Sequence, residues 1–253
     1  MRKGVYILPN LLTTGNLFCG FWSIVSVFQE QYFYGAVAIL LASVFDALDG
    51  KVAKMSGATS KFGVEYDSLA DLASFGIAPA VLAFSWALRP YGRFGWLAAF
   101  LFVACGALRL ARFNVLTATS DPKYFKGLPI PAAASMIALI ILLYLRLFET
   151  GWTKDIVILV MTFTLAYLMV SNIRYFSFKE FDLARRKPFS LLILLVLSMI
   201  VIIMEPTIVL FSFALGYVFS GPVSMIIGWQ KKSAMKRKEK TGVPLSEEPR
   251  HQS

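Results

Sequence analysis

Residues 46–71 read DALDGKVAKMSGATSKFGVEYDSLAD, and this stretch joins two apolar segments, at 32–54 and 64–88. Each segment is long enough to cross a bilayer as an α-helix, which takes roughly 20 residues. Because the loop between them, at 55–62, is short, the two helices are expected to be antiparallel neighbours. The stretch therefore predicts a helical membrane hairpin that carries four aspartates at one end.

The composition of the whole chain supports a membrane protein. Of its 253 residues, 57% are hydrophobic and 16% are charged, whereas soluble domains have about 45–50% and about 25%. This excludes a soluble enzyme, a disordered chain and a repeat solenoid. Cys19 and Cys105 lie in apolar runs, which excludes a disulfide scaffold or a zinc site. The only histidine, His251, is in the tail, so histidine chemistry within the membrane is excluded too.

Apolar segments long enough to span a membrane recur along the chain. They predict an all-α integral membrane protein, a bundle of about eight transmembrane helices. The predicted spans are 8–28, 32–54, 64–88, 94–116, 130–148, 155–174, 189–204 and 206–229. We expect residues 1–230 to form one transmembrane domain and residues 231–253 to be a basic, disordered tail that touches anionic headgroups.

The basic residues predict how the bundle is oriented. With eight spans both termini lie on one side of the membrane, and that side holds 21 of the 25 Lys and Arg residues. Cytoplasmic loops are the ones enriched in Lys and Arg. Both termini, the tail and the loop at 55–62 are therefore expected in the cytoplasm.

Four acidic residues lie within the predicted spans, Asp46 and Asp49 in the second and Asp67 and Asp71 in the third. A charge at the centre of a bilayer costs about 2.5–3.5 kcal/mol on insertion scales. These residues lie nearer the interface, where the cost is smaller, but four carboxylates together still need compensation. They must be either protonated or neutralised by cations.

The spacing of these acids favours cations. At 100° per residue, each helix places its two aspartates on one face, together with Gly50 and Ala53 on the first helix and Gly63 and Ser74 on the second. Carboxylate oxygens suit Mg²⁺ or Mn²⁺. Two such ions about 3.5–4 Å apart form the usual clamp for displacement at phosphorus. The sequence thus predicts a dimetal site at the cytoplasmic side.

Small residues flank the acids, and they allow two interpretations. Gly50, Ala53 and Gly63 could let helices pack closely. Alternatively, their small size could leave room for a nucleotide beside the carboxylates.

The pattern of residues 46–71 resembles the signature of the CDP-alcohol phosphatidyltransferase family, D-x2-D-G-x2-A-R-x8-G-x3-D-x3-D. All four aspartates, both glycines and Ala53 match at the right spacing. The departure is Lys54, where the family has Arg; the charge is kept but the bidentate fork is lost. Further stretches, PNLLT at 9–13, EYDSLADLASFGIAPA at 65–80, RLARFNV at 109–115 and GLPIPAAA at 127–134, resemble the branch of this family that uses serine.

The resemblance implies an activity and roles for the matching residues. Family members cleave CDP-diacylglycerol: an alcohol, here L-serine, attacks the phosphorus attached to the lipid, and CMP leaves. By resemblance, Asp46, Asp49 and Asp67 would hold one divalent cation, and Asp67 with Asp71 the second, with Asp71 as general base. Gly50, Ala53 and Gly63 would line the nucleotide pocket, and Lys54 would face the phosphates. The family also implies a homodimer.

The acceptor site is less clearly marked. Arg109 and Arg112, three residues apart on one helix face, could bind the serine carboxylate, with Asn114 nearby. They could equally be positive-inside anchors at the end of their span. The loop at 119–129 could form the wall of the pocket. On charge alone, inositol phosphate or glycerol phosphate would also fit as acceptor, and an archaeal ether lipid as donor.

A cation-coupled transporter is the alternative from another class, because intramembrane acids also mark ion pathways. It predicts acids near the midplane and repeated halves with broken helices. Here the acids cluster towards one membrane face and the sequence has no visible repeat. The basic tail has no motif or aromatic pattern for nucleic acid, so no nucleic-acid partner is expected.

Overall fold

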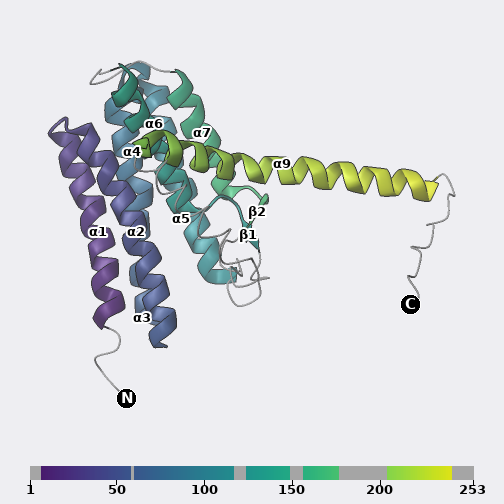
Figure 1. Ribbon diagram of the computed structural model, residues 1–253, viewed down its shortest axis with the longest axis horizontal. Helices are drawn as coiled ribbons and strands as arrows, with labels where there is room; N and C mark the ends of the chain where they lie inside the picture. The colour runs from purple at the N-terminus through teal and green to yellow at the C-terminus, as the bar shows by residue number, and fades with distance from the viewer. Residues whose placement is uncertain (1–6, 58–59, 117–123, 149–155, 177–203, 241–253) are drawn as a thin grey trace.

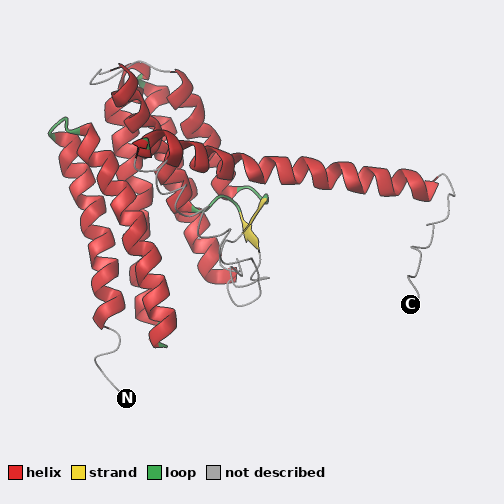
Figure 2. Ribbon diagram, viewed as in Figure 1, coloured by secondary structure: helices red, strands yellow, loops and turns green. Residues whose placement is uncertain are grey.

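The computed structural model describes residues 7–57, 60–116, 124–148, 156–176 and 204–240. The described part is a bundle of helices from which α9 extends to one side (Figure 1; Figure 2). The longer helices are α1 (Ile7–Phe28), α2 (Tyr32–Ser56), α3 (Lys61–Asp71), α5 (Arg93–Leu116), α6 (Ile130–Phe148), α7 (Ile156–Val170) and α9 (Pro206–Lys240).

Helices occur at seven of the eight predicted spans, and the protein is a multi-pass membrane protein. Five helical stretches are long and apolar enough to cross a bilayer, at Ile7–Phe28, Lys61–Tyr91, Arg93–Val115, Ile130–Phe148 and Pro206–Met225. The helix α2 has 25 residues but carries the charged end of the hairpin, and α7 has only 15. The predicted span at 189–204 lies, except for Met204, outside the described residues.

The third predicted span is one irregular helix, Lys61–Tyr91. After α3 it widens into a π-helical turn, η1 (Leu72–Ile77), continues as α4 (Ala78–Ala83), and ends in η2 (Phe84–Leu88) and η3 (Arg89–Tyr91). Each π-helical turn precedes a proline, Pro79 or Pro90. A proline ring clashes with the carbonyl four residues earlier in a regular α-helix, and a wider turn relieves that clash. The first of these turns starts directly after Asp71.

The helix α1 packs tightly against this irregular helix. A Cβ at Gly20 would collide with the backbone and side chain of Ser74 in η1. The Ser74 hydroxyl donates a hydrogen bond to the backbone carbonyl of Asn16, at 2.9 Å. The close approach that Gly20 permits therefore brings the polar first half of α1 next to the end of α3 that carries Asp71.

Two short strands accompany the helices of this all-α bundle. β1 (Tyr124–Lys126) pairs antiparallel with β2 (Arg174–Phe176), in the register Phe125 opposite Tyr175. Both sequences, YFK and RYF, are rich in aromatic residues that favour strands. Tyr175 is buried and donates a hydrogen bond to the Val218 carbonyl of α9. Burial, assisted by Tyr217, raises the pKa of Tyr175 to about 12, so the hydroxyl stays protonated to make this contact.

The last helix continues beyond the predicted domain boundary at residue 230. α9 runs to Lys240 without a break, past the internal Pro222. Residues 231–240 read KKSAMKRKEK, and Lys, Arg, Ala, Met and Glu are strong helix formers. At its other end α9 is tied to α6 by an ion pair between Glu205 and Arg146, 2.5 Å between Oε2 and Nη1.

Candidate functional site

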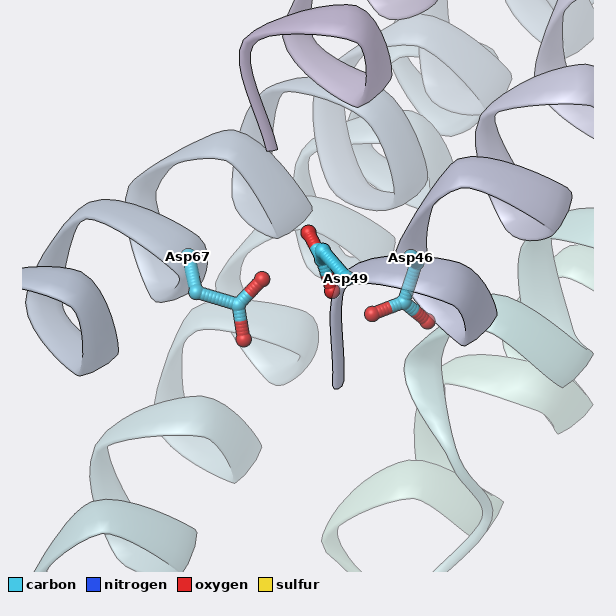
Figure 3. A group of neighbouring side chains, drawn as sticks. All are labelled: Asp46, Asp49 and Asp67. Atoms are coloured by element: carbon cyan, nitrogen blue, oxygen red, sulfur yellow. The ribbon is translucent and has the colours of Figure 1, made fainter. Parts of the chain in front are cut away.

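Three of the four predicted acids come together from α2 and α3. Asp46, Asp49 and Asp67 each offer a carboxylate oxygen within 4.8 Å of the others. Figure 3 shows the three side chains facing one another. Asp49 is buried, and the other two are half-buried. The arrangement is that of a group that can hold a metal ion.

The electrostatics of this group require a cation or protons. Two carboxylates at this separation repel each other by about 3.5 kcal/mol at an effective dielectric constant of about 20. Moreover, Asp67 Oδ1 is buried and has no hydrogen-bond partner among the described residues. A buried acceptor without a partner is costly. The donor set, all hard oxygens, fits Mg²⁺ or Mn²⁺ and supplies an unused ligand atom for it.

Asp71 lies beside this group, one helical turn after Asp67. It is buried, and the charges of Asp46 and Asp67 act on it. Its Oδ1 accepts a hydrogen bond of 3.0 Å from Asn16 Nδ2 of α1. Asp71 therefore has one oxygen fixed by Asn16 and stands next to the three clustered carboxylates.

The helix α1 contributes a second polar contact to the site. The Thr13 hydroxyl lies 2.7 Å from Asp49 Oδ2 and 3.1 Å from the Pro9 carbonyl. Sequence reasoning missed both Thr13 and Asn16 as site residues. Their signal is that they lie three residues apart in an apolar span, and so share one helix face.

The residues that are predicted to contact a nucleotide lie beside the carboxylates. Gly50 faces open space, since a Cβ there would meet no atom within 4 Å. Ala53 is half-buried and Lys54 is exposed in the last turn of α2. Gly63 lies in the first turn of α3, where its N–H donates to the capping Ser60 hydroxyl at 2.9 Å. Helix packing accounts for Gly63 in part but gives no reason for the glycine at 50.

The three acceptor candidates on α5 have different surroundings. Arg109 is influenced by the charges of Asp71 and Asp46, and its Nε is buried without a partner among the described residues. Arg112 donates to Asn172 Oδ1 at 2.6 Å and to the Val170 carbonyl at 3.3 Å, at the end of α7.

Asn114, the third candidate, donates to Ser68 Oγ of α3 at 2.9 Å. Of the two arginines, then, Arg109 lies closer to the acids, while the guanidinium of Arg112 binds the end of α7. The predicted acceptor loop at 119–129 is described only from Tyr124 onward, where β1 begins.

Comparisons with known proteins match this chain over most of its length. Residues 6–170 match the model of the CDP-alcohol phosphatidyltransferase family. The CDP-diacylglycerol–serine O-phosphatidyltransferase of Helicobacter pylori is 42% identical over 176 residues, 70% of this chain and 74% of the relative. The protein of the same name from Bacillus subtilis is 35% identical, over 68% of this chain and 92% of the relative. The archaetidylserine synthase of Methanothermobacter thermautotrophicus is 38% identical, over 66% and 69%.

Proposed function

This chain belongs to the CDP-alcohol phosphatidyltransferase family, and we propose that it transfers the phosphatidyl group of CDP-diacylglycerol to the hydroxyl of L-serine. The products are phosphatidylserine and CMP. The observation that carries the proposal is the carboxylate group of α2 and α3, because it coincides with the family signature at 46–71. The names of the relatives from Helicobacter pylori and Bacillus subtilis supply both substrates.

The reaction is a single in-line displacement at phosphorus. The serine oxygen forms a bond to the phosphorus that carries the lipid, and the bond from that phosphorus to the oxygen of the CMP phosphate breaks. The serine hydroxyl proton passes to Asp71, whose Oδ1 is fixed by Asn16 and whose other oxygen remains to accept it. CMP leaves with the electron pair of the broken bond.

We expect the site to hold two divalent cations, Mg²⁺ or Mn²⁺. Asp46, Asp49 and Asp67 would hold one, and Asp67 with Asp71 the other. When bound, such ions neutralise the pyrophosphate and the charge that develops on the leaving CMP. The Thr13 hydroxyl keeps Asp49 in place for this role. Lys54, at the end of α2, adds a positive charge for the phosphates.

The names of the relatives agree on serine but differ in the lipid. The archaeal relative is named as an archaetidylserine synthase. Its name contains serine, as the names of the other relatives do, but it refers to a different lipid. An ether-lipid donor is therefore the second candidate. A purified-enzyme assay that follows CMP release with CDP-diacylglycerol and with its ether-lipid analogue decides between the two.

The same assay tests the acceptor. L-Serine, inositol phosphate and glycerol phosphate are offered separately at equal concentration with CDP-diacylglycerol. We expect rapid CMP release with serine alone. Release that is faster with a phosphorylated alcohol would overturn serine as the acceptor while leaving the reaction class intact.

The placement of the enzyme in the membrane follows from its charges. We propose that both termini and the carboxylate site face the cytoplasm, since that side would hold 21 of 25 basic residues. The transmembrane domain of residues 1–230 would carry the activity as a homodimer, with residues 231–253 as a basic cytoplasmic extension.

A substitution at Gly50 tests whether this glycine serves nucleotide binding or helix packing. In Gly50→Ala the added methyl meets nothing within 4 Å, and Ala favours a helix by roughly 0.5–1 kcal/mol over Gly. We expect an equal or higher Tm together with a severalfold higher KM for CDP-diacylglycerol, because the methyl occupies the nucleotide pocket. Thermal unfolding and CMP-release kinetics measure the two effects. An unchanged KM would remove Gly50 from the pocket.

Substitution by lysine is expected to have different effects at Arg109 and at Arg112. Lysine cannot reproduce a bidentate contact with a carboxylate. Arg109→Lys should therefore raise the KM for serine about 10-fold and leave the KM for CDP-diacylglycerol nearly unchanged. Arg112→Lys loses contacts to the end of α7 and should lower the Tm without changing serine kinetics. Normal serine saturation in Arg109→Lys would exclude this arginine from the acceptor site.

A further inference from the structure

Three residues around Asp71 each carry a buried polar atom without a partner in the described part of the chain. Among the described residues, Asp67 Oδ1, Asn16 Oδ1 and Arg109 Nε are all buried and unpaired. Asp67 lies one helical turn before Asp71, Asn16 donates a hydrogen bond to it, and Arg109 is influenced by its charge. Because these atoms are closed to solvent, bulk water cannot satisfy them. A group bound in the site would supply the missing partners.

Hydrogen-bond chemistry determines which atom of the Asn16 amide is left unpaired. An ionised carboxylate only accepts hydrogen bonds, so the amide must turn its Nδ2 towards Asp71. This leaves Oδ1, an acceptor, on the other side of the amide group. Asn16 is fully buried, and its backbone is held by the Ser74 hydroxyl. The side chain therefore presents an acceptor beside Asp71.

We propose that Asn16 determines the specificity for serine: Nδ2 positions Asp71, and Oδ1 accepts a hydrogen bond from the substrate ammonium group. The inference rests on the proposed function, and it gives Asn16 Oδ1 and Arg109 Nε complementary roles. Arg109 Nε is a donor for the serine carboxylate, and Asn16 Oδ1 is an acceptor for the ammonium. A zwitterion bound between them would place its hydroxyl near Asp71.

The competing explanation is that Asn16 Oδ1 is a metal ligand. The group of carboxylates within 4.8 Å of one another consists of Asp46, Asp49 and Asp67. The hydrogen bond of Asn16 goes to Asp71, which would hold the second ion together with Asp67. A metal role therefore predicts a raised activation constant for Mg²⁺ or Mn²⁺ in Asn16→Ala, whereas a substrate role predicts a changed preference among acceptors.

The test compares L-serine with 3-hydroxypropionate, which keeps the hydroxyl and the carboxylate but lacks the ammonium. We expect Asn16→Ala to reduce the ratio of kcat/KM for serine over 3-hydroxypropionate about 10- to 100-fold, the range for a lost hydrogen bond to a charged group. If the analogue reacts too slowly, its inhibition constant against serine replaces its kcat/KM. Ethanolamine, which keeps the ammonium but lacks the carboxylate, should lose activity in parallel with serine.

A ratio within one protein is insensitive to how much of the variant folds, so partial misfolding does not obscure the result. Asn16→Asp keeps an acceptor but cannot donate to Asp71; it should keep the preference for serine and lose turnover. The matched control is Ser23→Ala, which removes another buried, unpaired oxygen two turns further along α1, and its ratio should equal that of the wild type.

Two results would overturn the role of Asn16 without touching the proposed function. One is an unchanged ratio in Asn16→Ala while the wild type uses serine. The other is an unchanged ratio combined with a raised activation constant for Mg²⁺ or Mn²⁺, which would assign Oδ1 to the metal. If the wild type itself releases no CMP with serine, it is the proposed function that fails.

Discussion

Asp71→Asn is expected to lower kcat for CMP release at least about 100-fold, the lower end for the loss of a general base. Asparagine has nearly the same size and can still accept the hydrogen bond from Asn16 at Oδ1. The variant should therefore fold and bind CDP-diacylglycerol, while it lacks the group that takes the serine proton. Steady-state kinetics and equilibrium binding of CDP-diacylglycerol measure the two properties separately.

The matched control is Glu65→Gln on the same helix. Glu65 is exposed and lies roughly 160° around α3 from Asp67. Its substitution removes one negative charge, as Asp71→Asn does, but away from the site, and activity should stay near that of the wild type. An active Asp71→Asn together with an inactive Glu65→Gln would show that the catalytic face is the opposite side of α3, and that our assignment is wrong.

Chelation with excess EDTA is expected to abolish CMP release, and Mg²⁺ or Mn²⁺ should restore it. The physical reason is the repulsion within Asp46, Asp49 and Asp67, which offer oxygens within 4.8 Å of one another, and the unpaired Asp67 Oδ1. Full activity in excess chelator would contradict metal-assisted transfer.

Metal binding can also be followed without activity. A ligand that binds only the folded protein raises its Tm with concentration, so Mn²⁺ or Mg²⁺ should stabilise the wild type. Asp67→Asn should lose both this stabilisation and the activity. Glu65→Gln should keep both.

The clustering of the acids could be predicted from the sequence because all of them lie within one helical hairpin. Asp46 and Asp49 are three residues apart on one helix, and a short loop joins it to the helix of Asp67. Helical periodicity and the short connection bring these three side chains together, with no knowledge of the rest of the fold.

Contacts between distant segments could not be predicted in this way. Asn16 reaches Asp71 across 55 residues of sequence, and periodicity within α1 does not say which helix its polar face meets. The pairing of β1 with β2, which are far apart in sequence, is another such case. Likewise, the sequence places Arg109 and Arg112 on one face of α5, but not the end of α7 that binds Arg112.

The irregular helix Lys61–Tyr91 lies between these cases. Its prolines mark where a regular helix must be disturbed, but not whether the helix kinks, ends or widens. The close packing of Gly20 against Ser74 accompanies the widened turn that follows Asp71. This packing depends on tertiary structure.

The most direct test of the central claim is the yield of both products from purified wild-type protein. CDP-diacylglycerol, L-serine and Mg²⁺ or Mn²⁺ are supplied together, and CMP and phosphatidylserine are measured in the same reaction. We predict equal molar amounts of the two products and neither of them when serine is left out. CMP formed at the same rate without serine, or without any matching phosphatidylserine, would contradict transfer to serine by this protein.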